Sequence, residues 1–237
     1  MTHDIKPVYL LAGGRPRNRK KQDTLLQAVF RGYGIASPTI AYSGTASGDD
    51  KNFFNFISAE LIQAGAGRVN HAVIVPEGSD IKKAQSILES ADIVFVSGGD
   101  VEAGMDILQE RKMIGFLNEL YRQGKPFFGI SAGAIMLADR WVRWRDPDDD
   151  DSAELFPCLG FAQIICDTHD EQGGWEELQA AIRLEKEGGR GYGLASGSGV
   201  KVTPDGKVEA LGGDVYQYTH HGDRVERIEN IRPINQD

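Results

Sequence analysis

The chain has 237 residues, which fits one large domain or two small ones, and 41% of them are hydrophobic, enough for a sizeable core. Its formal net charge of −9 argues against partners with a nucleic-acid backbone, which need a basic surface, and against anionic membranes. With only two cysteines, Cys158 and Cys166, disulfides do not organise the fold, and we expect a cytoplasmic protein. We expect no signal peptide, and no apolar run reaches the roughly 18 residues of a membrane span.

The first half of the chain alternates short apolar runs with segments of helical spacing. The apolar runs, each predicted as a buried strand, are residues 8–11, 37–42, 69–75, 91–96 and 126–130. The segments predicted as helices are residues 23–31, 52–64, 80–88 and 105–122. This alternation is typical of βα units, so we predict an α/β fold in three layers, with a mostly parallel central sheet and helices on both faces.

The pattern changes in the second half of the chain. Residues 145–151, RDPDDDD, are predicted to be an acidic, solvated surface loop. A strand is predicted over residues 161–167 and a helix over residues 175–187. The glycine-rich β-type runs from residue 191 onward are interpreted as an antiparallel or mixed extension of the same sheet. With no repeat and no long linker, we predict a single domain over residues 1–237.

A serine lies between two glycines at the end of the fifth predicted strand. Residues 129–133, GISAG, fit the pattern G-x-S-x-G, with a strand before it and a helix-forming segment after it. A sharp strand-to-helix turn would present the Ser131 hydroxyl above the sheet and set the Ala132 N–H close to a developing oxyanion. A tight βα turn without catalytic function is the alternative interpretation.

The preceding predicted strand also ends in glycines, in residues 97–100, SGGD. In an open parallel sheet, ligands bind outside the carboxyl ends of the strands. The bare backbone of Gly98 and Gly99 is therefore a candidate second oxyanion donor, and Asp100 is a further binding candidate. Of the five histidines, only His169 directly follows a predicted strand that could lie beside the serine strand, so it is the candidate general base.

Three segments together resemble the dipeptidase E and cyanophycinase family of serine peptidases: FVSGGD (95–100), GISAGA (129–134) and CDTHDEQGG (166–174). The resemblance covers roughly residues 5–220 and implies a flavodoxin-like fold similar to that of class I glutamine amidotransferases. It implies that Ser131 is the nucleophile, that His169 is the base, and that the backbone around Gly98, Gly99 and Ala132 forms the oxyanion hole. Since the family cleaves bonds next to aspartate, the resemblance implies a small peptide substrate that contains aspartate.

The third member of a catalytic triad departs from the family pattern. The family usually has a glutamate in a G-[LI]-x-E segment, whereas residues 193–196 read GLAS. Ser196 cannot stabilise an imidazolium by charge. We consider Asp146 first, because an aspartate of dipeptidase E falls at that place, and Glu171 second. The remaining candidates are Asp167 and Asp170.

Two groups of side chains bear on the substrate. Trp141, Trp144 and Trp175 flank the predicted cleft and either line an apolar subsite or pack in the core. The basic residues after the first strand either attract a substrate carboxylate or form a solvated loop. They are Arg15, Arg17, Arg19, Lys20 and Lys21.

We therefore predict a serine hydrolase that cleaves small peptides through an acyl-enzyme on Ser131. No metal or organic cofactor is implied, because the cysteines lack zinc spacing and no dinucleotide or Walker pattern occurs. Glutamine amidotransferase activity itself is excluded, since it uses a cysteine where Ser131 stands. The missing glutamate leaves open an inactive or impaired binding or regulatory protein on the same scaffold. A homodimer is allowed.

Overall fold

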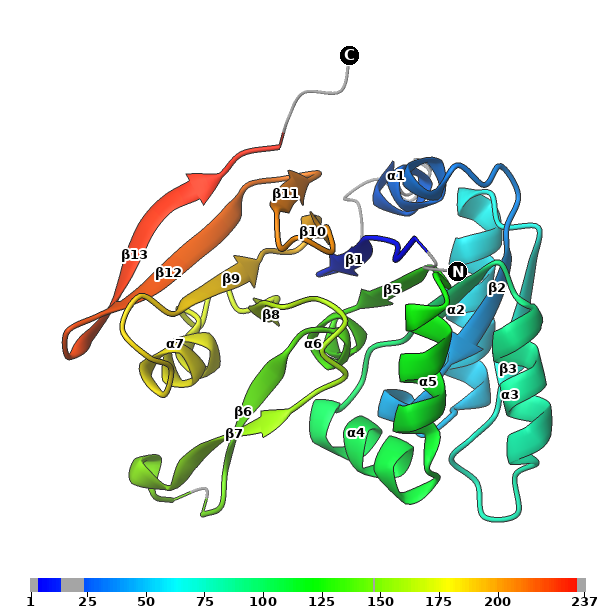
Figure 1. The fold of residues 1–237 in the computed structure, drawn as a ribbon, viewed down its shortest axis with the longest axis horizontal. Helices are drawn as coiled ribbons and strands as arrows, with labels where there is room; N and C mark the ends of the chain where they lie inside the picture. The colour runs from blue at the N-terminus through cyan, green and yellow to red at the C-terminus, as the bar shows by residue number, and fades with distance from the viewer. Residues whose placement is uncertain (1–3, 14–23, 147, 234–237) are drawn as a thin grey trace.

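The computed structural model describes residues 4–13, 24–146 and 148–233, coloured along the chain in Figure 1. The first described strands are β1 (Val8–Leu11), β2 (Thr39–Ser43), β3 (Arg68–Ala72), β4 (Ile93–Val96), β5 (Phe127–Ile130), β6 (Arg140–Trp144) and β7 (Ala153–Pro157). They are followed by β8 (Ile165–Thr168), β9 (Arg190–Leu194), β10 (Gly199–Val202), β11 (Val208–Leu211), β12 (Val215–His221) and β13 (Arg224–Ile231). The described α-helices are α1 (Thr24–Tyr33), α2 (Lys51–Ala64), α3 (Ile81–Ser90), α4 (Val101–Glu110), α5 (Met113–Arg122), α6 (Ala132–Leu137) and α7 (Glu176–Arg183).

Seven described strands form the main sheet, in the order β11-β10-β1-β5-β4-β2-β3. The strands β1 to β5 run parallel, and β10 and β11 add an antiparallel edge beside β1. The strands β1 and β4 are buried along their whole length, which explains why they read as continuous apolar runs. The mostly parallel α/β fold predicted from the sequence is confirmed.

Helices cover both faces of the main sheet. On one face, Leu26 and Phe30 of α1 and Leu61 of α2 pack against Phe95 and Phe128. The other face packs against α3, α4, α5 and α6, and the same apolar cluster continues into β8, β9, α7 and β12. No helix in the described part of the chain is long and apolar enough to cross a membrane.

A second sheet has the order β13-β12-β9-β8, with β8 parallel to β9 (Figure 1). The prediction of one extended sheet is correct for β10 and β11 and wrong for β9, β12 and β13. The prediction that the strand before His169 lies beside the serine strand is also wrong. Residues 161–164 instead turn against the end of α6, where the N–H groups of Phe161 and Ala162 donate to the carbonyl of Leu137. Strand β8 therefore begins only at Ile165 and pairs with β9.

Two further elements differ from the prediction. The strands β6 and β7 form an antiparallel hairpin, and the acidic residues at its tip are exposed, as expected. The helix predicted over residues 105–122 is two helices, α4 and α5. The chain breaks at Lys112, which has a left-handed φ of 57°, while the Arg111 guanidinium donates to the carbonyl of Val75. Helix α4 begins at Val101 because the Asp100 carboxylate caps it by accepting from the Ala103 N–H.

Candidate active site

Ser131 occupies a strained turn between β5 and α6. Its φ is 57° and its ψ is −127°, a conformation that costs a non-glycine residue on the order of 1–3 kcal/mol and that is concentrated at functional sites. The Ser131 N–H donates to the carbonyl of Leu11, which fixes the turn to the end of β1. The strain holds the side chain at the carboxyl edge of the sheet, where it lines a pocket.

The glycines at 129 and 133 are there because no side chain fits. A Cβ on Gly133 would lie 2.1 Å from the carbonyl oxygen of Val96, and a Cβ on Gly129 would lie 2.3 Å from the carbonyl oxygen of Gly133. The start of α6 is thus pressed against the ends of β4 and β5. The G-x-S-x-G pattern is a packing requirement of this turn.

Backbone N–H groups surround the serine. A Cβ on Gly98 would lie 3.0 Å from Ser131 Cβ and 3.5 Å from its Oγ, so the loop after β4 lies directly against the nucleophile candidate. Gly99 has a φ of 144°, and a Cβ there would lie 1.9 Å from the carbonyl oxygen of Ala46. Within the described residues, the N–H groups of Gly98, Gly99 and Ala132 donate to no protein acceptor. They can therefore donate hydrogen bonds to a charged oxygen.

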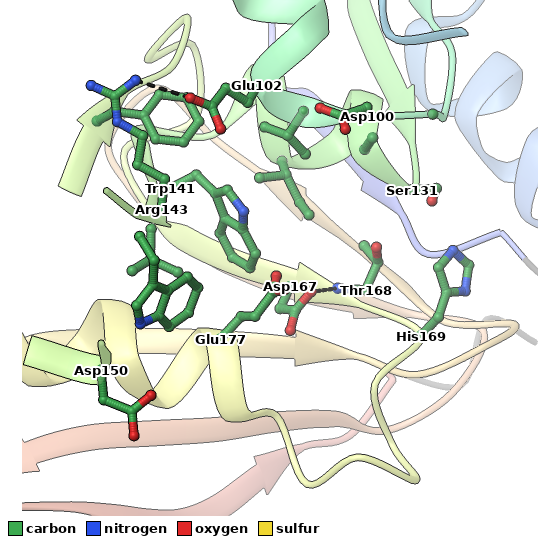
Figure 2. A pocket seen from close by; sticks show the side chains of 17 residues that line it. Asp100, Glu102, Ser131, Trp141, Arg143, Asp150, Asp167, Thr168, His169 and Glu177 are labelled. Carbon is green, nitrogen blue, oxygen red and sulfur yellow. Dashed lines mark hydrogen bonds and ion pairs between the residues drawn. The ribbon is translucent and has the colours of Figure 1, made fainter. Parts of the chain in front are cut away.

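His169 reaches the same pocket from the second sheet. It follows β8 with a left-handed φ of 65°, and its N–H donates to the carbonyl of Leu194, which continues the β8–β9 pairing. A Cβ on Gly13 would lie 2.7 Å from Ile130 Cγ2 and 3.8 Å from His169 Cε1, so Gly13 lies between the end of β5 and the imidazole. Figure 2 shows Ser131 and His169 at one end of the pocket. No hydrogen bond joins these two described side chains.

The electrostatics favour a neutral imidazole. Desolvation lowers the pKa of His169 from its ordinary value of 6.5, and the negative charge of Glu171 partly offsets this. Burial acts to raise the pKa of Glu171, but hydrogen bonds from its own N–H and from Ser196, together with His169, hold it below its ordinary value. The Glu171 carboxylate accepts from the Ser196 N–H at 3.3 Å. A charged carboxylate thus interacts with His169 and is bonded to the backbone of Ser196, the residue that stands where the family pattern has a glutamate.

The other carboxylate candidates lie elsewhere. Asp146 is exposed in the turn of the β6–β7 hairpin, where its carboxylate accepts from the Asp148 N–H, and it is not among the described residues that line the pocket. Asp170 accepts from the Glu176 N–H, before α7. Asp167 is 5% exposed and lines the pocket, and burial raises its pKa to about 7. Asp100 lines the pocket while its carboxylate caps α4.

The pocket has a volume of about 590 Å³, within the range of small-molecule sites. The hairpin forms its wall with Trp141, Val142, Arg143 and Trp144, and α7 contributes Glu177. Trp175 is 2% exposed and packs against Gly193 and Tyr216, so it belongs to the core. The basic residues Arg15, Arg17, Arg19, Lys20 and Lys21 lie outside the described residues.

The sequence interpretation missed the hairpin wall. The alternation in RWVRW (140–144) is a strand signal of period two that would have predicted β6, yet nothing in it indicates that Arg143 faces a pocket. Glu177 was also missed, because an acidic residue in the first turn of a helix is common. Among the described residues, no group of three or more histidine, cysteine or acidic side chains could hold a metal ion.

Comparison with known proteins shows that the chain is similar to peptidases. The sequence model of Peptidase family S51 matches residues 8–209 of the chain. Peptidase E of Haemophilus influenzae is 30% identical over 81 residues, which span 32% of this chain and only 37% of that relative. An uncharacterized peptidase of Bacillus subtilis, YgaJ, is 24% identical over 167 residues, which span 70% of each chain.

Two solved structures share the fold. A peptidase from an acI-B1 Actinobacterium superimposes with a TM-score of 0.71 at 16% identity and covers 98% of each chain. A putative Peptidase E protein from Listeria monocytogenes EGD-e has a TM-score of 0.63 at 14% identity, covering 87% of this chain and 98% of its own. At these identities the likeness concerns the fold alone.

Proposed function

Because the chain belongs to peptidase family S51, we propose that it is a serine peptidase that cleaves small peptides through an acyl-enzyme on Ser131. The observation that carries the proposal is the strained turn at Ser131, with three backbone N–H groups beside it that have no protein acceptor among the described residues. Such strain persists only where the surrounding packing maintains it, and it is concentrated at functional sites.

The proposed reaction has two halves. Ser131 Oγ attacks the peptide carbonyl carbon while His169 takes its proton, and the N–H groups of Ala132 and the Gly98–Gly99 loop stabilise the resulting oxyanion. The carbon–nitrogen bond then breaks, and His169 returns the proton to the leaving amine. In the second half, a water molecule gives a proton to His169 and attacks the acyl ester; the bond to Ser131 Oγ breaks, His169 returns the proton to Oγ, and the acid product leaves. The hydrogen bond between Ser131 and His169 is expected to form when the substrate binds, because catalytic hydrogen bonds often tighten only in the complex with substrate.

We assign the orienting carboxylate to Glu171. Support comes from its electrostatic interaction with His169 and from its hydrogen bond with the Ser196 N–H, at the place of the missing glutamate. Asp146 is the weaker candidate, because its carboxylate is exposed and bonded within its own turn. A carboxylate beside the imidazole stabilises the imidazolium that forms in the transition state.

An inactive binding or regulatory protein is the second candidate function. The observations that favour it are Ser196 in place of a glutamate and the absence of a hydrogen bond between the described side chains of Ser131 and His169. The experiment that decides is hydrolysis of a dipeptide library, followed by mass spectrometry of the products, by the unaltered protein, Ser131→Ala and Ser90→Ala. Ser90 is an exposed serine at the end of α3 and serves as the control.

The proposal expects cleavage of at least one dipeptide by the unaltered protein and by Ser90→Ala. Loss of Ser131 is expected to reduce the rate by a factor of about 10³ or more. Cleavage that survives in Ser131→Ala contradicts the proposed nucleophile. Binding of dipeptides without any cleavage would favour the second candidate.

A further inference from the structure

The part of the pocket beyond the serine is acidic. Its described lining contains five carboxylate residues and one arginine. That arginine, Arg143, already donates to Glu102 at 3.1 Å and to Glu154 at 2.9 Å. The remaining acidic side chains are therefore not neutralised by it. Figure 2 shows Arg143 and Glu102 paired at the rim, with Asp167 and Glu177 between Trp141 and the end of the pocket that holds Ser131.

Asp167 is the unusual member of this group. It is 95% buried, and its only described hydrogen bond comes from the N–H of the next residue, Thr168, at 2.6 Å. No lysine, arginine or histidine in the described part of the chain pairs with it or with Glu177. A buried carboxylate is ordinarily paired or fully hydrogen-bonded, because removing its charge from water is costly. Its free bonding capacity faces the pocket, since Asp167 lines it.

Apolar surfaces lie beside the two carboxylates, of which Asp167 is buried and Glu177 is exposed at the mouth of the site. The side chains of Ile135, Trp141, Val142 and Phe156 line the same pocket and are each at least nine-tenths buried. Such walls exclude water and strengthen the attraction between a carboxylate and a cation. They also fit the methylene stem of a lysine or arginine side chain, whose charged head can lie near the face of an indole ring.

The spacing along β8 fits a side chain of that length. Asp167 lies in β8 and precedes His169, which follows the strand, by two residues, so their backbones are at most about 7 Å apart. A substrate whose peptide bond lies beside Ser131 and His169 could therefore place the side chain of a neighbouring lysine or arginine within reach of Asp167. The α-amino group of a dipeptide lies closer to the cleaved bond than the charged end of such a side chain does, so it would stay near the serine.

We propose that this acidic subsite, Asp167 and Glu177 beside Trp141, binds the side chain of a lysine or arginine next to the bond that is cleaved. The inference rests on the proposed peptidase function and names its substrate class. An aspartate side chain at the same place would meet like charge and lose affinity. The raised pKa of both carboxyl groups, with desolvation as the largest cause, fits a site that lacks its cationic partner.

The test measures binding and hydrolysis separately. Binding is measured by calorimetry with the Ser131→Ala protein, using Lys-Ala, Ala-Lys and their norleucine counterparts, which keep the stem but lack the charge. Blocked peptides of the same series separate the side chain from the free α-amino group. Norleucine, aspartate and lysine peptides are then compared as substrates of the unaltered protein.

We expect a lysine peptide to bind about 10- to 100-fold more tightly than its norleucine counterpart, whether the α-amino group is free or blocked. The preference should disappear in Asp167→Asn and weaken in Glu177→Gln, while Asp106→Asn, an exposed change on α4, should keep it. Glu177 is exposed on α7, so its substitution tests the site without disturbing the core.

Equal binding of lysine and norleucine peptides, no binding of either, or a preference that survives in both Asp167→Asn and Glu177→Gln would overturn the subsite. Cleavage of neutral and basic peptides at equal rates would overturn it too, while leaving the proposed peptidase function intact. If the preference for lysine peptides requires a free α-amino group, the subsite binds that group and not the side chain, which would contradict the proposal. Absence of all cleavage, with the lysine preference in binding retained, would refute the peptidase function and keep the subsite.

Discussion

At the turn after β5, close contacts decide which residue types fit at each position. Ser131 adopts a conformation that favours glycine, and its two glycine neighbours sit where carbonyl oxygens leave no room for a Cβ. The energetic cost of this turn is carried by the packing of α6 against β4 and β5. The proposed nucleophile is therefore held in a conformation that the surrounding packing imposes.

Substitution of Gly133 tests this constraint. In Gly133→Ala the new Cβ would overlap the carbonyl of Val96, and we expect a loss of about 1–3 kcal/mol or more in the free energy of unfolding, measured by urea denaturation. The matched control is Gly115→Ala on α5, where nothing lies within 4 Å of an added Cβ. There the helix should gain up to about 1 kcal/mol. Equal effects of the two substitutions would contradict the packing explanation.

The pH dependence of hydrolysis reports on His169. A general base must be neutral, and desolvation lowers the pKa of His169 below 6.5, so kcat/KM should stay high into mildly acidic solution and fall only below that value. Because the Glu171 charge raises this pKa, Glu171→Gln should shift the acidic limb to still lower pH and reduce kcat roughly 10²- to 10⁴-fold. An acidic limb that does not move, or an equal loss in Asp146→Asn, would favour another carboxylate.

Asp167 links the pocket to stability. Its pKa is raised from 3.8 to about 7 in the folded protein, so the folded state binds the proton more tightly than the unfolded state. Stability is then lost as the pH rises from about 4 through about 7, by at most about 4 kcal/mol. We expect Asp167→Asn to raise the melting temperature above pH 7 and to change it little near pH 4. A uniform shift at both pH values would contradict the assignment of the titrating group, with Asp106→Asn as the control.

Among the helices, strands and turns that form the site, some could be predicted from the sequence and others could not. The strands β1, β4 and β5 could be predicted because burial on both faces leaves continuous apolar runs with glycine at their ends. The turns that hold Gly98 and Ser131 could be found for the same reason. A sequence pattern places these positions at the carboxyl edge of a sheet without any knowledge of side-chain contacts.

The rest of the site depends on contacts that no local pattern encodes. His169 could be identified, but its strand pairs with β9 in a second sheet, because residues 161–164 are tied to the end of α6. The proposed role of Glu171 depends on the segment that follows β9, which brings Ser196 beside it. Trp141 and Arg143 enter the pocket through a hairpin whose alternation shows a strand and not its docking.

The β6–β7 hairpin is connected to α4 by the ion pair between Arg143 and Glu102, whose side chains are 39% and 50% exposed. Such pairs contribute about 0–1 kcal/mol, so Arg143→Gln should change the free energy of unfolding little. It removes the one described cation of the pocket lining and should lower KM for lysine peptides relative to norleucine peptides. Steady-state kinetics with both peptide series measure this, and a rise in KM for the lysine series alone would contradict it.

At the scale of the whole molecule, the two sheets share one core. The same apolar cluster contains Val8 and Val94 of the main sheet and Leu194 and Val215 of the second sheet. The proposed nucleophile and base come from different sheets, so their alignment depends on this shared packing. We expect a single calorimetric unfolding transition that coincides with the loss of activity, as predicted for a single domain. Two separate transitions would contradict it.

The central claim is that Ser131 is an activated nucleophile and His169 its base. Its most direct test is reaction with a fluorophosphonate, followed by peptide mapping with mass spectrometry. We expect one adduct, on Ser131, that is strongly reduced in His169→Ala and unchanged in His221→Ala, an exposed histidine at the end of β12. An unlabelled Ser131, or labelling that persists without the His169 imidazole, would contradict the proposed roles of these two residues.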